Sequence, residues 1–149
     1  IVHRAIGSLR LRVVVEGPGG HSWADRGAPN PIVAVAAAAN ELATLPLPGG
    51  DRTALTVARM GGGTSVNAIP DAAWMELDLR SEAEGVLAEL RGAVTGIVER
   101  CVEAEGRRGG PLRHSILTIG DRPGGCTPAD APLVRAACNV TAALGARAE

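Results

Sequence analysis

Hydrophobic and polar residues alternate along several stretches of the chain, which is the pattern of β-strands with one buried and one exposed face. The alternation is clearest in residues 9–16 and 72–80, where apolar side chains take every second position and Arg, Glu or Asp lie between them. Residues 53–60 alternate more weakly, and residues 113–119 form a fourth candidate. The pattern therefore predicts four strands.

Two segments between these strands have the features of helices. Asn30 is a suitable N-cap, and the proline after it fits the first position of a helix that we expect to span residues 31–45. Ser81 and Glu84 have the spacing of a capping box, and an apolar stripe at helical spacing follows them until Gly106. The order of elements is thus β-α-β-β-α-β.

This order predicts the α+β class and a ferredoxin-like fold, with a four-stranded antiparallel sheet and two helices on one face. Residues 120–125 are rich in glycine and are expected to be a linker. A third helix is expected to begin near Asp130 and to end near Leu144. Because the βαββαβ unit is already complete, this helix is interpreted as part of a neighbouring domain.

The composition narrows the range of functions. The chain has 149 residues, a formal net charge of −1, no Lys, no Phe, no Tyr and two Trp. Nucleic-acid-binding domains usually have an excess of basic residues and exposed aromatics, so this class is disfavoured. No apolar run is long enough to span a membrane. One domain is expected, and because the chain begins at Ile1 in the middle of a pattern, we interpret it as a segment of a longer protein.

The three cysteines lack the spacing of a metal finger, and their odd number argues against a disulfide framework. They are therefore interpreted as free thiols in the reducing cytoplasm. No His, Cys, Asp or Glu cluster has ligand spacing, so we expect no metal site in this chain. A glycine run at residues 61–63 lacks the Gly-Lys-Ser/Thr ending of a phosphate-binding loop, and a flexible turn is the simpler interpretation.

Three polar residues stand out as candidates for chemistry. His21 follows a glycine-rich strand end and could donate a hydrogen bond to developing negative charge, or be an ordinary surface histidine. Asn67 follows a second glycine run and could satisfy backbone groups of a turn. Arg80 could clamp a carboxylate, or form ion pairs with Glu76 and Asp78 on the same strand face.

Three motifs in this order carry a resemblance to a known family: Gly-Pro-Gly-Gly-His-Ser at 17–22, Gly-Gly-Gly-Thr-Ser-Val-Asn-Ala-Ile-Pro at 61–70, and Leu-Asp-Leu-Arg-Ser at 77–81. The chain resembles the lid, or dimerisation, domain of the M20 family metallopeptidases, in particular the tripeptidase T-like branch. The resemblance implies a lid domain over residues 1–122. It also implies that residues 123–149 are a linker and the first helix of a returning catalytic domain.

The resemblance implies roles for the three candidate residues. His21 would stabilise a tetrahedral intermediate in the active site of the other subunit, Asn67 would contact substrate, and Arg80 would bind the carboxylate of a peptide or acyl-amino acid. A homodimer is expected to form through the helix at 31–45 and the strand at 53–60. Family members hold two divalent metals, usually zinc, in a separate catalytic domain.

That catalytic domain is absent from this sequence, so the chain alone is expected to be inactive. The sequence then predicts a non-catalytic portion of a two-metal peptidase or amidohydrolase. An alternative is a free-standing ferredoxin-like module of the ACT type that senses amino acids. A third hypothesis is a nucleic-acid-binding ferredoxin-like domain. The sequence lacks the aromatic residues and the excess of basic residues that such a domain would need.

Overall fold

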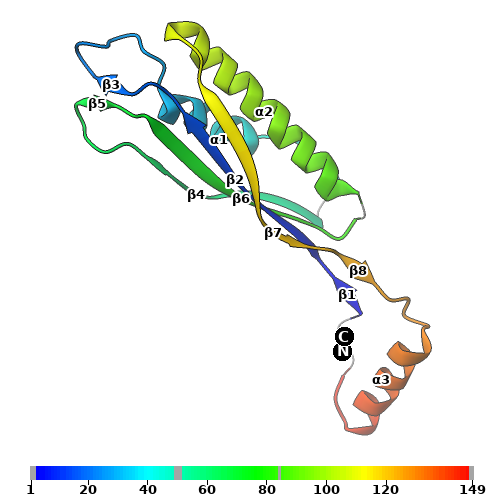
Figure 1. The fold of residues 1–149 in the computed structure, drawn as a ribbon. Coiled ribbons are helices and arrows are strands. Elements are labelled where there is room, and N and C mark those ends of the chain that lie inside the picture. The colour runs from blue at the N-terminus through cyan, green and yellow to red at the C-terminus, as the bar shows by residue number, and fades with distance from the viewer. Residues whose placement is uncertain (1–2, 49–51, 84, 148–149) are drawn as a thin grey trace.

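Four long strands form one antiparallel sheet, and two helices cover one of its faces (Figure 1). The computed structural model describes residues 3–48, 52–83 and 85–147. The spatial order of the strands is β4-β6-β2-β7, which confirms the predicted ferredoxin-like α+β fold. The elements are β2 (Gly7–Glu16), α1 (Pro31–Ala43), β4 (Thr53–Gly62), β6 (Ala72–Ser81), α2 (Val86–Gly109) and β7 (Arg113–Arg122).

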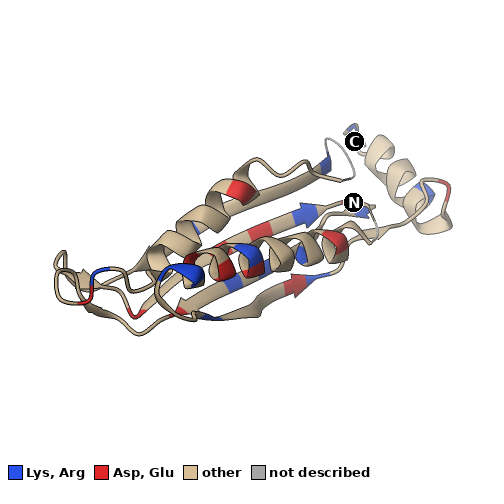
Figure 2. Cartoon of the chain, turned by 90° about the horizontal axis from the view of Figure 1, so that it is seen from above, with Lys and Arg blue, Asp and Glu red and all other residues tan. Residues whose placement is uncertain are grey.

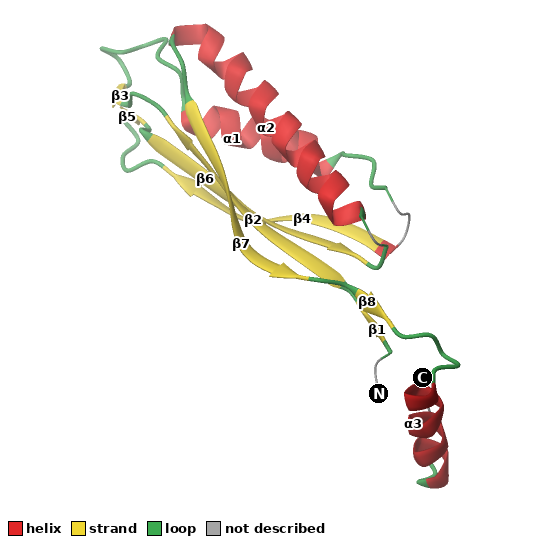
Figure 3. Ribbon diagram, turned by 45° about the vertical axis from the view of Figure 1, so that its right-hand side comes forward, coloured by secondary structure: helices red, strands yellow, loops and turns green. Residues whose placement is uncertain are grey.

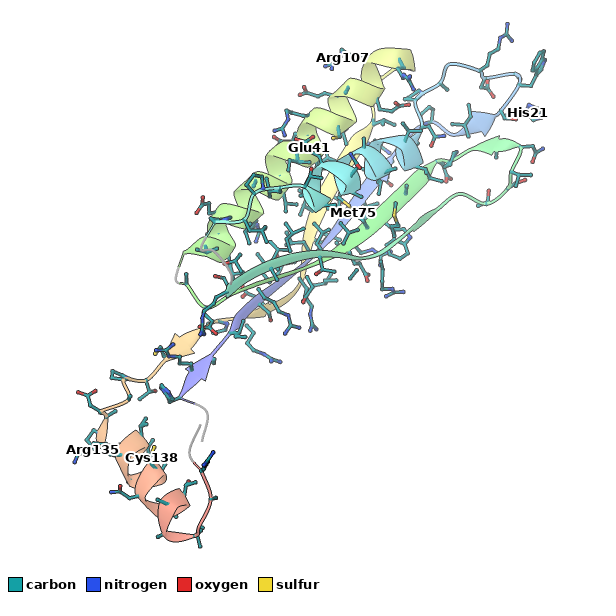
Figure 4. All side chains as sticks on the ribbon, turned by 180° about the vertical axis from the view of Figure 1, so that it is seen from behind. His21, Glu41, Met75, Arg107, Arg135 and Cys138 are labelled. Atoms are coloured by element: carbon teal, nitrogen blue, oxygen red, sulfur yellow. The ribbon has the colours of Figure 1, made fainter. Side chains whose placement is uncertain are left out.

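The core lies between the sheet and the two helices (Figure 3). The apolar faces of the two central strands meet there, because Leu11 of β2 pairs with Leu77 of β6 and Val13 pairs with Met75. These side chains are at most 1% exposed, and Figure 4 shows Met75 on the helix side of the sheet. The alternation read from the sequence thus predicted correctly which face of each central strand is buried.

The two helices differ in charge (Figure 2). Helix α1 contains one charged residue, Glu41, and packs over β4 and β6. Helix α2 carries charges along its exposed side and packs over β6, β2 and β7. Helix α1 begins as predicted, since the Asn30 side chain accepts a hydrogen bond from the amide of Ile32 at 2.9 Å. It ends at Ala43, two residues before the predicted end.

The predicted capping box at the start of α2 is wrong. Ser81 is the last residue of β6, and its hydroxyl lies 3.1 Å from that of Thr53 on the neighbouring strand. The helix begins at Val86, and its N-cap is Gly85, whose φ of 81° is in the left-handed region. Glu84 lies outside the described residues. Cross-strand pairing therefore holds Ser81 in the sheet, and the helix continues to Gly109, beyond the predicted end.

The predicted linker at 120–125 is also partly wrong. Strand β7 continues to Arg122, and β8 (Gly125–Cys126) then pairs with β1 (Arg4–Ala5) in a short antiparallel ribbon. The glycines do not end the extended structure, because the first residues of the chain offer a partner strand. Beyond the ribbon lies α3 (Pro132–Ala143), the third predicted helix (Figure 1). No helix in the described part of the chain is long and apolar enough to cross a membrane.

The core position of Leu77 provides a test of this packing. Replacing the side chain in Leu77→Ala should lower the free energy of unfolding by about 2–5 kcal/mol, because a buried cavity replaces the lost side chain. The matched control is Leu117→Ala on the other face, where Leu117 is 52% exposed. Urea denaturation of both variants should show the large loss only for Leu77, and equal losses would contradict this assignment of faces.

Candidate functional site

The two glycine-rich motifs meet at one end of the sheet. Strand β3 (Gly20–His21) pairs with β5 (Ala68–Ile69), so that His21 lies opposite Ala68. The amide of Ser22 also donates to the carbonyl of Asn67 at 3.0 Å. His21 projects at this tip, and α3 lies at the opposite end of the molecule (Figure 4). The structure thus brings together two of the three candidate residues, through backbone pairing between loops 45 positions apart in the chain.

The glycines of the first motif are needed for this geometry. Gly19 has a φ of 65°, which residues with a side chain rarely adopt. A Cβ on Gly20 would lie 2.8 Å from a carboxylate oxygen of Asp25. The same carboxylate accepts a hydrogen bond from the backbone amide of His21 at 2.7 Å. Gly20 therefore leaves room for the acceptor that fixes the His21 backbone.

The imidazole of His21 has a defined orientation. Its Nδ1 accepts hydrogen bonds from the amides of Trp23 at 3.2 Å and Ala24 at 3.4 Å. Because Nδ1 is an acceptor, the neutral ring carries its proton on Nε2. The residue is exposed, so that this N–H is free to donate to a group outside the loop.

The amide of Asn67 is oriented in a similar way. The hydroxyl of Ser65 donates to its Oδ1, which leaves the NH₂ group of the exposed Asn67 side chain as a donor. The tip therefore presents two N–H donors, one from His21 and one from Asn67. Donors held in place in advance are suited to stabilising negative charge that develops on an oxygen during a reaction.

The loop that follows His21 is tied to the body of the domain at its far end. The backbone amide of Asn30 donates to the carboxylate of Glu105 at 3.0 Å. Glu105 is only 7% exposed and belongs to α2, where Arg108 pairs with it at 3.5 Å. A buried carboxylate with two partners thus links the end of this loop to the longest helix.

Arg80 lies at the other end of the sheet. It is the second-last residue of β6, eight residues beyond the first, which corresponds to about 26 Å along an extended strand. One substrate molecule therefore cannot contact His21, Asn67 and Arg80 of the same chain without a large rearrangement. The three candidates divide into a pair at the tip and a separate arginine.

An acidic neighbour orients the Arg80 guanidinium. Its Nε donates to Asp78 at 2.7 Å, and Arg10 donates to the other oxygen of the same carboxylate at 3.0 Å. The hydrogen bond from Arg80, followed by that from Arg10, holds the pKa of Asp78 below its usual value against the opposing effect of burial. Within the described residues the Nη nitrogens of Arg80 make no hydrogen bond, so the ion pair and a carboxylate clamp are compatible.

Two residues that support the site were not identified from the sequence. Asp25 holds the backbone of His21, and Ser65 orients Asn67. Both lie close in sequence to the residue they support, and short polar side chains in turns commonly bond to nearby backbone. That spacing was the only signal available, and it is common in loops without function.

Metal chemistry has no ligand set in the described part of the chain. No three His, Cys, Asp or Glu side chains there come close enough together to hold an ion. The three cysteines are free, with Cys101 buried and the other two exposed. The described residues therefore do not form a two-metal centre, which the family resemblance assigns to a separate catalytic domain.

Comparison with protein families gives a match to the peptidase dimerisation domain over residues 3–103. Comparison with curated proteins finds no match. Among solved structures, the chain is similar to a hydantoinase/carbamoylase family amidase from Burkholderia vietnamiensis, with a TM-score of 0.80 and 18% identity, over 97% of this chain and 34% of the amidase.

Two further structures have the same fold. Aminopeptidase PepT from Bacillus cereus has a TM-score of 0.70 and 20% identity, over 100% of this chain and 38% of the peptidase. An aminobenzoyl-glutamate utilization protein from Klebsiella pneumoniae has a TM-score of 0.74 and 20% identity, over 84% of this chain and 31% of that protein. The chain thus spans about a third of the length of these proteins.

The shared acceptor Asp78 gives a pH-dependent prediction. A carboxyl whose pKa is lowered by folding stabilises the protein above its unfolded pKa of about 3.9, and this contribution is lost as the pH falls through the folded value. Asp78→Asn should therefore lower the free energy of unfolding at pH 7 by up to about 1 kcal/mol, since the pair is partly exposed. In urea titrations the loss should shrink as the pH falls below the unfolded pKa, and it should vanish once the pH lies below the lowered folded pKa.

The control for this experiment is Asp121→Asn, because Asp121 is exposed on β7 and forms no ion pair within the described residues. It should change stability little at either pH. A loss for Asp78→Asn that is equally large in acid would show that the carboxylate acts through packing, not through its charge.

Proposed function

Because this chain belongs to the M20 peptidase dimerisation domain family, we propose that it is the lid and dimer-forming portion of a metal-dependent peptidase or amidohydrolase. The observation that carries the proposal is the pair of oriented N–H donors at the tip. His21 and Asn67 would donate to the oxygen of a tetrahedral intermediate, and Arg80 would bind a substrate carboxylate. Peptides and acyl-amino acids contain both an amide carbonyl, which would form that intermediate, and a carboxylate.

The catalytic chemistry is assigned to a separate domain. The described residues lack a metal ligand set, and the solved relatives are about three times as long as this chain. We therefore place two divalent metals, zinc by resemblance, in a catalytic domain to which this lid is joined. The three free cysteines of this chain support a cytoplasmic location, where thiols stay reduced.

The edge formed by α1 and β4 is the proposed dimer interface. Strand β4 is an edge of the described sheet, and α1 packs over it. Ile32, Ala36, Ala39 and Ala43 follow each other at helical spacing on α1. Ile32 faces this edge, because its Cδ1 lies 3.4 Å from where a Cβ on Gly63 would stand. An uncharged face of small residues beside a free strand edge suits close approach of an identical subunit.

The separation of the two donor groups determines how a dimer would use them. The tip of one lid and the Arg80 end of the same lid are too far apart to contact one substrate. In a two-fold dimer, the tip of one subunit would reach the active site of its partner. Arg80 would serve the active site of its own subunit. Each active site would then require both chains.

The dimer interface can be tested with a single charge. Ala36→Arg places a guanidinium on the exposed α1 face and should convert the dimer to a monomer, because like charges would meet across the two-fold axis. Ala88→Arg is the matched control, since Ala88 is an exposed alanine on α2. Sedimentation velocity should show a monomer only for the first variant, and dimers for both would place the interface elsewhere.

The division of roles between subunits can be tested in the intact protein that contains this chain. His21→Ala should lower kcat by roughly 10²–10³-fold, the usual loss for one oxyanion donor. Arg80→Ala should mainly raise KM for substrates with a free carboxylate. Neither homodimer then has a complete active site.

Mixed dimers of these two variants should regain activity. One of their two active sites would have an intact His21 from the partner and an intact Arg80 from its own subunit. Peptidase or acyl-amino-acid hydrolase assays after subunit exchange would detect this recovery. Mixed dimers as inactive as both parents would show that the two residues act from the same chain. A parent homodimer that keeps full activity would show that its substituted residue does not act.

A further inference from the structure

The face of the sheet that the helices leave uncovered carries a row of polar residues at the Arg80 end. Ser8 of β2 pairs with Arg80 of β6 on one side and with Arg122 of β7 on the other. Residues directly opposite each other in a sheet point to the same face. Ser8 therefore stands between two arginines, whose backbones are about 10 Å apart across two strand spacings.

This row has an excess of positive charge. Arg10 is the next residue of β2 on this face, two positions after Ser8, and it shares the carboxylate of Asp78 with Arg80. Arg122 is exposed and forms no ion pair with any residue that the structure describes. Three guanidinium groups thus face one carboxylate, which gives this group a net charge of about +2. Arg10 and Arg80 share Asp78, and Arg122 has no acidic partner among the described residues.

The other nearby acids that the structure describes are paired with other groups or lie on the opposite face. Glu82 pairs with Arg52 at 2.6 Å. Asp121 lies opposite Leu9, a core residue, and so its backbone position belongs to the helix side of the sheet. On the same open face, Glu76 is held by Arg12 at 2.8 Å and by Arg59 at 3.0 Å. The excess charge is therefore confined to the end of the sheet where Arg80 lies.

We propose that Arg80, Ser8 and Arg122 form a site for a dicarboxylate, so that Arg122 and Ser8 bind a second carboxylate beside the one on Arg80. This inference rests on the role proposed above for Arg80. Guanidinium groups bind carboxylates through paired charge-assisted hydrogen bonds, and a hydroxyl between them can donate to either ligand group. The ligand class is a peptide or acyl-amino acid that ends in Glu or Asp.

Side-chain NMR on this chain tests the site without any catalysis. The probes are glutarate, which has two carboxylates, and glutaramate, in which one is an amide of nearly the same shape. At low ionic strength, glutarate should shift the Nε–Hε resonances of both Arg80 and Arg122. Glutaramate should bind at least about tenfold more weakly, because one charge-assisted contact is lost.

Two variants make the test specific. Arg122→Gln should bind glutarate and glutaramate equally. Arg113→Gln should keep the preference, since Arg113 lies at the far end of the same strand beside Glu16. Equal affinity of the wild-type chain for both probes, or no shift with glutarate at any concentration that leaves the protein folded, would overturn the proposal. Retained preference in Arg122→Gln would do the same.

This experiment is independent of the tests of the proposed function. The chain could bind glutarate selectively and yet stay monomeric, while the intact protein hydrolyses no peptide. That result would support the dicarboxylate site and reject the lid function. An active dimer whose lid does not distinguish the two probes would reject the dicarboxylate site alone.

Discussion

The antiparallel pairing of β2 with β6 is the constraint on which the rest of the structure depends. It sets Leu11 against Leu77 and Val13 against Met75 on the buried face. A shift of β6 by one residue against β2 would turn the apolar side chains of the shifted strand to solvent. The same register sets Ser8 beside Arg80 and Arg12 beside Glu76 on the open face. Burial of the core thus also determines which polar residues become neighbours.

The length of these strands separates two kinds of chemistry. One end of the sheet carries N–H donors oriented by groups of their own loops, and the other carries arginines held by Asp78. A rigid sheet between them keeps the two groups apart at a fixed distance. In the two-fold dimer proposed above, this separation would let one domain contact two different active sites.

The site itself depends on local hydrogen bonds and on one distant contact with the body of the domain. The His21 loop has short hydrogen bonds to Asp25 at one end and a link to the buried Glu105 at the other. Its exposed residues, including Trp23 at 76%, contribute little to the core. The position of the loop is therefore set by these hydrogen bonds and not by burial of its side chains.

The sequence by itself determined the strand order along the chain, the buried faces and the ferredoxin-like class, because period-two alternation and helical stripes are local signals. It also singled out His21, Asn67 and Arg80, although their roles remain predictions. It misplaced the start of α2 and the end of β7, because Ser81 pairs with Thr53 and residues 125–126 pair with the first strand.

Only the tertiary structure decided which of these residues lie together. The contacts of the site join loops far apart in the chain, such as the link from Ser22 to Asn67 and the row from Arg80 through Ser8 to Arg122. No local pattern encodes such pairs. They follow from the lateral order of the strands, which the chain reaches only when its two apolar strand faces are buried together under the helices.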